Sequence, residues 1–171
     1  MLMLELDMEK NIELCVGSET DFDDYFQFLI EKVKWFEQNN IDQWTLEYVN
    51  RTFSKEPNKE YIDNGQFFVL KIDGKVSAGC IVKHKSKNWA DTKDFAYIIN
   101  LVGGVKGAGK KLIEELAKFF KSKGMKYLRL VCRDNNKELR EFYKGIGFTE
   151  LDRVPHSTEA GVFSRRFNME L

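Results

Sequence analysis

The stretch NLVGGVKGAGKKL, residues 100–112, decides the fold. It joins an apolar run, FAYIINLV at 95–102, to a segment with helical periodicity that begins at Gly109. Glycines in such a loop allow the backbone to approach a ligand closely, and the free N–H groups at a helix N-terminus bind anions. The stretch therefore predicts a strand, a phosphate-binding loop and a helix, in that order.

The composition is that of an ordinary globular protein, with 43% hydrophobic and 32% charged residues in a chain of 171. This length predicts a single domain, 1–171. Lys and Arg together number 27, as do Asp and Glu, so no overall basic field favours nucleic acid. The start, MLMLELDMEK, lacks the apolar run of a signal peptide or membrane span. Three scattered cysteines fit reduced thiols, so we expect a cytoplasmic protein; they are Cys15, Cys80 and Cys132.

Apolar periodicity predicts four helices and seven strands. The helices are expected at 18–40, 45–53, 109–123 and 135–147. The strands are expected at 12–17, in a hairpin at 66–83, and at 94–102, 126–133, 148–154 and 163–171. The order predicts a mixed α/β fold, with a mostly antiparallel central sheet flanked by helices.

Two local signals support this arrangement. The hairpin strands meet at Asp73-Gly74, a dipeptide typical of type I′ turns. The connection from strand 94–102 through helix 109–123 to strand 126–133 predicts one parallel crossover in the sheet.

The glycine loop first suggests a nucleotide-binding P-loop, Gly-x4-Gly-Lys-Ser/Thr. Gly104, Gly109 and Lys110 fit this pattern, but Lys111 stands where the magnesium-binding hydroxyl belongs. The dinucleotide pattern Gly-x-Gly-x-x-Gly fails, because Leu112 stands in the last glycine position. A P-loop-like nucleotide-binding protein remains an alternative.

A third interpretation is a loop that binds pyrophosphate without a metal. It needs only a strand end, a glycine loop and the free N–H groups at the start of a helix. Lys106, Lys110 and Lys111 cluster at the N-terminal end of the predicted helix. Cations there oppose the helix dipole at a cost of a few tenths of a kcal/mol each, up to ~1. A bound anion would remove this conflict; the alternative is that the lysines are simply solvated.

A second motif follows at 135–148, NNKELREFYKGIGF. Asn136 is followed seven residues later by Tyr143, and then by Gly147-Phe148. With the glycine loop, this motif resembles the GNAT superfamily of acyl-CoA-dependent N-acyltransferases, which share an Asn…Tyr…Gly-Phe pattern. The resemblance is strong over 94–153, whereas the N-terminal half agrees only in element order, with a weak similarity at 35–44.

The loop departs from the family at one position. The family pattern is Gln/Arg-x-x-Gly-x-Gly/Ala before a helix; Gly107 and Gly109 match it, but Gly104 replaces the Gln or Arg. This departure from the family pattern removes one side-chain contact and leaves a cradle of backbone groups possible.

The resemblance implies acetyl-CoA as the co-substrate. Its pyrophosphate would be held by Gly104, Lys106, Gly107, Ala108, Gly109 and Lys110. By the same analogy, Leu101 and Val102 hydrogen-bond the pantetheine arm like an added strand, and Asn136 and Tyr143 lie on the cofactor. Tyr143 is the implied catalytic residue, a general acid for the leaving thiolate. The structural alternatives are a core aromatic at Tyr143 and a helix capping box formed by Asn135 with Glu138.

The acceptor amine must lose a proton before it attacks, because an alkylamine has a pKa near ~10. Asn100 cannot take this proton; Asp94 is a candidate but is expected to lie far from the thioester carbonyl, and Glu13, Asp42 and Glu47 cannot be ranked. A water relay is equally consistent with the sequence. His84 and His156 have no partners at metal-ligand spacing, so no metal is expected.

The expected function is therefore transfer of an acetyl group from acetyl-CoA to a primary amine. The acceptor is a small molecule or a peptide: a polyamine, an amino acid, an antibiotic, or a protein N-terminus or lysine. Zero net charge disfavours a nucleic-acid acceptor. The alternatives are the P-loop-like protein and a non-catalytic CoA-binding domain. The closing strand, GVFSRRFNMEL, suggests pairing into a homodimer.

Overall fold

The computed structural model describes residues 10–156 and 159–171. The chain divides into two compact units. The N-terminal unit comprises the described residues up to Ile81 together with Asn100–Glu115, and the C-terminal unit comprises Val82–Ile99 and Leu116–Leu171.

The architecture is mixed α/β, with a seven-stranded, mostly antiparallel sheet in the order β1-β2-β3-β4-β5-β7-β6. The strands are β1 (Ile12–Val16), β2 (Phe67–Ile72), β3 (Lys75–Lys83), β4 (Phe95–Gly103), β5 (Tyr127–Arg133), β6 (Thr149–Pro155) and β7 (Phe163–Glu170). The helices are α2 (Glu19–Gln38), α3 (Leu46–Thr52), α4 (Lys55–Asp63), α5 (Ala108–Ser122) and α6 (Lys137–Ile146). All eleven predicted elements are confirmed.

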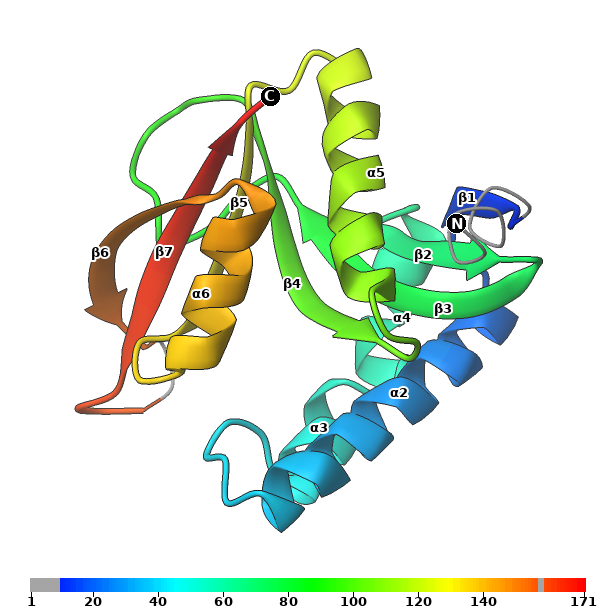
Figure 1. Ribbon diagram of the computed structural model, residues 1–171, viewed down its shortest axis with the longest axis horizontal. Coiled ribbons are helices and arrows are strands. Elements are labelled where there is room, and N and C mark those ends of the chain that lie inside the picture. Colours follow the sequence, from blue (N-terminus) through cyan, green and yellow to red (C-terminus); the bar gives the residue numbers. More distant parts are fainter. Residues whose placement is uncertain (1–9, 157–158) are drawn as a thin grey trace, which may run out of the picture. The chain divides into compact units, whose positions relative to one another are not determined.

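In the N-terminal unit, α2 packs across β2 and β3 (Figure 1). It begins with a capping box, in which Ser18 accepts from the Asp21 amide and Asp21 accepts from the Ser18 amide. Its buried face consists of Phe22, Tyr25, Leu29, Val33 and Phe36. This i, i+3, i+4 spacing is what makes the segment a helix with one apolar face.

Helix α4 was not predicted. Its sequence, KEPNKEYID, buries only Asn58 and Ile62, so it lacks the periodic apolar stripe that identifies a helix. The Ser54 side chain makes no capping hydrogen bond. Pro57 stands in the first turn, where the missing N–H costs nothing. The Asn58 side chain stabilises the corner between α3 and α4 by donating to the carbonyls of Thr52 and Ser54.

The predicted hairpin and crossover are both confirmed. Asp73 and Gly74 have φ of 51° and 78°, as a type I′ turn requires. In the C-terminal unit β4 pairs in parallel with β5, from Phe95 opposite Tyr127 to Tyr97 opposite Arg129. The right-handed βαβ connection usual for such a pair needs a helix between the strands, and α5 supplies it.

The closing strand β7 does not offer a free edge for a homodimer. It lies between β5 and β6 and forms antiparallel ladders with both. The pairing strand foreseen in the sequence therefore pairs within its own chain, so β7 has no free edge for a second copy to extend, and the homodimer itself stays a prediction. Helix α6 packs on this part of the sheet, where the Tyr143 ring contacts the Phe167 ring at 5.4 Å (Figure 1).

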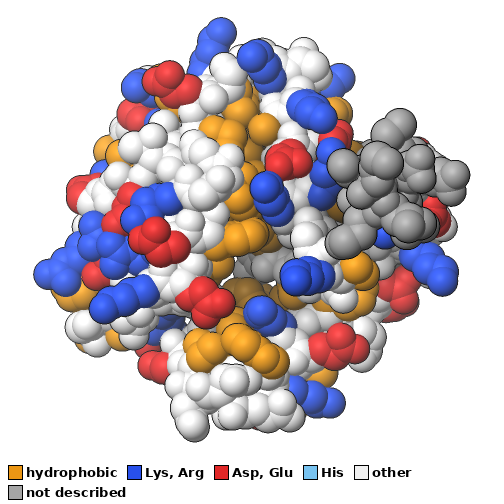
Figure 2. All heavy atoms as spheres, viewed as in Figure 1, with side chains coloured by type: hydrophobic (Ala, Val, Ile, Leu, Met, Phe, Trp, Pro, Cys, Tyr) orange, Lys and Arg blue, Asp and Glu red, His pale blue; other side chains and the backbone are white. Residues whose placement is uncertain are grey.

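Basic and acidic side chains are interspersed across the face drawn in Figure 2, in keeping with a net charge of zero. Among the described residues, no helix has the length and apolar character needed to cross a membrane. Cys80 and Cys132 are buried free thiols and Cys15 is half-buried.

Candidate functional site

The glycine loop between β4 and α5 is fixed at its start. The Gly104 amide donates to the Ser77 carbonyl of β3 at 2.8 Å. A Cβ at Gly104 would stand 2.3 Å from the Phe28 ring of α2. A side chain here would force the Phe28 ring to move, so packing favours glycine at the position where the family pattern has Gln or Arg.

The rest of the loop is open. Gly107 has φ of 83°, a left-handed conformation that favours glycine, and a Cβ at Gly107 or Gly109 would meet no atom within 4 Å. The Ala108 amide donates to Val105 and the Lys111 amide to Gly107. No described carbonyl accepts from the amides of Gly109 and Lys110. These two N–H groups belong to the first turn of α5, where a helix binds anions.

The three lysines at this end of α5 are not equivalent. Lys111 pairs with Glu115 at 3.2 Å and approaches Glu114 at 3.9 Å. Lys106 and Lys110 are exposed, and neither forms an ion pair with any described residue. Two cations are therefore available to an anion beside the open amides, and the third is compensated by its own helix.

Immediately before the loop, β4 contains a kink. Asn100 has φ of 54° within the strand, and its carbonyl oxygen accepts a hydrogen bond of 2.7 Å from the Tyr25 hydroxyl of α2. Leu101 is half-buried and Val102 is buried. The sequence predicts Tyr25 as part of an apolar helix face, and its hydroxyl, the one polar group on that face, is the available signal for this contact.

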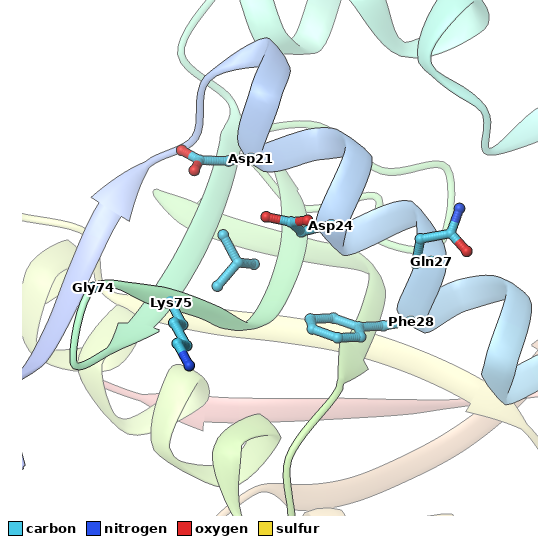
Figure 3. A pocket seen from close by; sticks show the side chains of 7 residues that line it. Asp21, Asp24, Gln27, Phe28, Gly74 and Lys75 are labelled. Atoms are coloured by element: carbon cyan, nitrogen blue, oxygen red, sulfur yellow. The ribbon is translucent and has the colours of Figure 1, made fainter.

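An open pocket of about 380 Å³ lies nearby in the N-terminal unit (Figure 3). Asp21, Asp24, Gln27 and Phe28 of α2 line one side, and the hairpin residues Gly74, Lys75 and Val76 line the other. Phe28, one of the lining residues, is also the side chain that lies beside Gly104. Its carboxylates disfavour an anion, and none of the sequence-predicted site residues lines it.

In the C-terminal unit, Asn136 is the N-cap of α6. Its side-chain oxygen accepts from the Leu139 amide at 3.1 Å. The capping box considered for Asn135 with Glu138 is therefore wrong, because the cap is one residue later. At the other end Gly147 has φ of 119° and terminates the helix, as the sequence predicted.

Tyr143 lies on the buried face of α6 and is 6% exposed. Its ring contacts the rings of Phe142, Phe148 and Phe167 at centroid distances of 5.4–5.8 Å. The ring is thus part of the core of the C-terminal unit. A catalytic role for Tyr143 would rest on its hydroxyl alone.

The candidate bases stay unranked. Glu13, Asp42, Glu47 and Asp94 are all exposed. Among residues 10–156 and 159–171, no group of three His, Cys, Asp or Glu side chains could hold a metal ion.

The N-terminal unit thus brings together Leu101, Val102 and the loop residues Gly104–Lys110, all on one continuous segment. Asn136 and Tyr143 share α6 in the C-terminal unit. Sequence analysis missed Tyr25, Phe28 and Ser77, which hold the first group from α2 and β3.

The model of the acetyltransferase (GNAT) family matches residues 30–148, which is more than half of the chain. Solved structures of similar fold include a GNAT-family acetyltransferase from Listeria monocytogenes, with a TM-score of 0.71 and 17% identity over 94% of this chain and 95% of that one. The PaiA N-acetyltransferase from Thermoplasma acidophilum, solved with coenzyme A, has a TM-score of 0.69 and 22% identity, covering 94% and 99%. A GNAT-family acetyltransferase from Bacillus cereus has a TM-score of 0.62 and 13% identity, covering 94% and 96%. No match was found among curated proteins.

Proposed function

Because the chain belongs to the acetyltransferase (GNAT) family, we propose that it transfers the acetyl group of acetyl-CoA to a primary amine by direct attack. The choice of a CoA thioester as the acyl donor rests on the N-terminal end of α5, where the amides of Gly109 and Lys110 have no described acceptor. The family match also removes the support for a P-loop protein, which already lacked the magnesium-binding hydroxyl at Lys111.

The loop has the chemistry that a pyrophosphate needs. Gly107, Ala108 and Gly109 present backbone without obstructing side chains, since Ala108 is buried and the two glycines face open space. Lys106 and Lys110 would neutralise the phosphate charge, and the amides of Gly109 and Lys110 would donate to its oxygens. The fixed Gly104 would set the start of this cradle through backbone alone.

Acetyl-CoA would supply an activated thioester. Backbone groups of Leu101 and Val102 would hydrogen-bond its pantetheine arm, and an N–H at this end of β4 would stabilise the oxyanion that forms on the thioester carbonyl. The attacking amine must be neutral. Its proton would be taken by one of the exposed carboxylates or through a path of water molecules.

Tyr143 is the proposed general acid. Its hydroxyl would protonate the leaving thiolate as the thioester is cleaved. Asn136 would serve mainly by starting α6 and so fixing the position of Tyr143, since its side-chain oxygen already accepts from Leu139.

The acceptor is proposed as a small-molecule or peptide amine. The family acts on amines, and zero net charge gives no support to a nucleic-acid acceptor.

Calorimetric titration with acetyl-CoA, with ATP and magnesium as the control, tests the proposal. We expect saturable binding of acetyl-CoA and no heat from ATP. A panel of primary amines, followed by release of the free CoA thiol, then tests transfer. Binding without transfer to any amine would indicate a non-catalytic CoA-binding domain, and the absence of acetyl-CoA binding would contradict the proposal.

A further inference from the structure

The kink in β4 is an unusual place for a residue that is not glycine. Asn100 has φ of 54°, in the left-handed region where L side chains are strained and asparagine is better tolerated than most. A left-handed residue inside a strand redirects the residues that follow it. Those residues are Leu101 and Val102, whose backbone groups are proposed to bind the acyl donor.

One side chain contacts the kink directly. The Tyr25 hydroxyl donates to the Asn100 carbonyl at 2.7 Å, and Tyr25 is 1% exposed. Burial raises the pKa of Tyr25 well above its ordinary value, so the hydroxyl keeps its proton and acts as a donor.

The Tyr25 ring is held on several sides. It contacts the rings of Phe22 at 5.2 Å and Phe67 at 5.1 Å. A Cβ at Gly79 would stand 2.6 Å from it, so glycine in β3 provides the room for the ring. The hydroxyl therefore has a fixed direction toward Asn100.

One turn further along α2, Phe28 lies against Gly104, whose amide is bound to the Ser77 carbonyl. The segment 100–104 is thus held at both ends, by Tyr25 at its first residue and by Phe28 with Ser77 at its last. The stretch between them contains the two residues proposed to bind pantetheine.

We propose that Tyr25 is a positioning residue for the acyl donor, whose hydroxyl holds the Asn100 peptide in its left-handed conformation and so orients the backbone groups of Leu101 and Val102. The consequence for the donor rests on the proposed function. The hold on the segment itself does not.

The test compares wild type with Tyr25→Phe, which removes one oxygen and keeps the ring packing. We expect acetyl-CoA to bind about tenfold more weakly in calorimetric titration, the effect of losing one buried hydrogen bond. Without any ligand, we expect amide hydrogen exchange at Leu101 and Val102 to become at least about tenfold faster, because the kink is released. Tyr97→Phe is the matched control: Tyr97 is also buried on β4, but its hydroxyl accepts from Asn88 at 3.2 Å, so both readouts should stay within about twofold.

Asn100→Gly separates positioning from simple stabilisation. Glycine adopts the left-handed conformation without strain, so Tyr25→Phe in this background should cost less than about threefold in acetyl-CoA affinity. A bond that only stabilised the fold would lower the melting temperature in both backgrounds and leave acetyl-CoA affinity unchanged, which would overturn the positioning role.

The outcomes distinguish this inference from the proposed function. If wild type binds acetyl-CoA and Tyr25→Phe binds equally well, the positioning role is overturned and the proposed function stands. If wild type fails to bind acetyl-CoA, the proposed function fails. If amide hydrogen exchange at Leu101 and Val102 is also unchanged in Tyr25→Phe, the positioning of this segment by Tyr25 is overturned as well.

Discussion

At the scale of single residues, Tyr143 combines a packing role with a proposed chemical one. Its ring is enclosed by Phe142, Phe148 and Phe167, so truncation to alanine would disturb the core of the C-terminal unit. Removing only the hydroxyl keeps this packing. The phenylalanine variant can therefore test the chemistry without confounding it with folding.

Tyr143→Phe should lower turnover about a hundredfold or more, the scale of a lost general acid. Acetyl-CoA affinity should change little, because the proposed role concerns the leaving thiolate rather than ground-state binding. Turnover is measured by release of the CoA thiol with the best amine of the panel, and affinity by calorimetry. Unchanged turnover would remove Tyr143 from the mechanism.

At the scale of elements, the N-terminal end of α5 carries cations where its dipole is already positive. Lys111 relieves part of this conflict through Glu114 and Glu115. Lys106 and Lys110 have no such compensation among the described residues. These two positive charges are unfavourable at the positive end of the helix dipole, and a bound phosphate would neutralise them.

The double variant Lys106→Ala/Lys110→Ala should bind acetyl-CoA about tenfold more weakly than wild type at low salt, or about 1.4 kcal/mol. Its affinity should also depend less on ionic strength, since two screened attractions are gone. Without ligand, the variant should be at least as stable as wild type, because the opposing dipole interaction is removed. Calorimetry in a salt series and thermal unfolding measure these effects.

The control removes the same charge from the other end of the same helix. Lys121→Ala/Lys123→Ala deletes two exposed lysines at the C-terminal end of α5, where cations favour the dipole. This variant should lose a little stability and keep its affinity for acetyl-CoA. Equal loss of affinity in both double variants would show only a general charge effect and contradict a local phosphate site.

The elements that could be predicted are those whose signal is local. The Thr45 cap of α3, the Asp73-Gly74 turn and the Gly147 stop each act within a few residues, and all three are confirmed. Helix α4 could not be predicted because its stability comes from Asn58 and Ile62 packing at a corner, and its sequence has no apolar stripe.

At the scale of the whole molecule, the sequence could predict the glycine cradle but not what holds it. Tyr25 and Asn100 are 75 positions apart, and Gly104 meets Phe28 and Ser77 from two other elements. No spacing along the chain indicates such contacts. Strand β7 lies between β5 and β6, so it has no free edge for a dimer. This strand order likewise cannot be predicted from local sequence patterns.

A second long-range contact anchors the segment between β3 and β4 in the C-terminal unit. Arg129 of β5 is 3% exposed and donates to both carboxylate oxygens of Asp91, at 2.9 and 2.8 Å. Its guanidinium lies over the rings of Trp89, Phe95 and Tyr127. A buried guanidinium left without its carboxylate is costly, so this pair should matter more than exposed ones.

Asp91→Asn should therefore lower the free energy of unfolding by about 2 kcal/mol at pH 7, within the range for hydrogen bonds to charged groups. The hydrogen bonds from Arg129 lower the pKa of Asp91 below its ordinary value, so wild type has the full benefit above the unfolded pKa and loses it as the pH falls through the folded one. The difference in unfolding free energy between variant and wild type should be constant from pH 7 to about 5 and shrink below about 4.

Asp152→Asn is the control. Its partner Arg166 is 21% exposed and Asp152 is 68% exposed, so the loss of stability should be within about 1 kcal/mol. Urea unfolding across this pH range measures both, and equal effects of the two substitutions would contradict the anchoring role of Arg129.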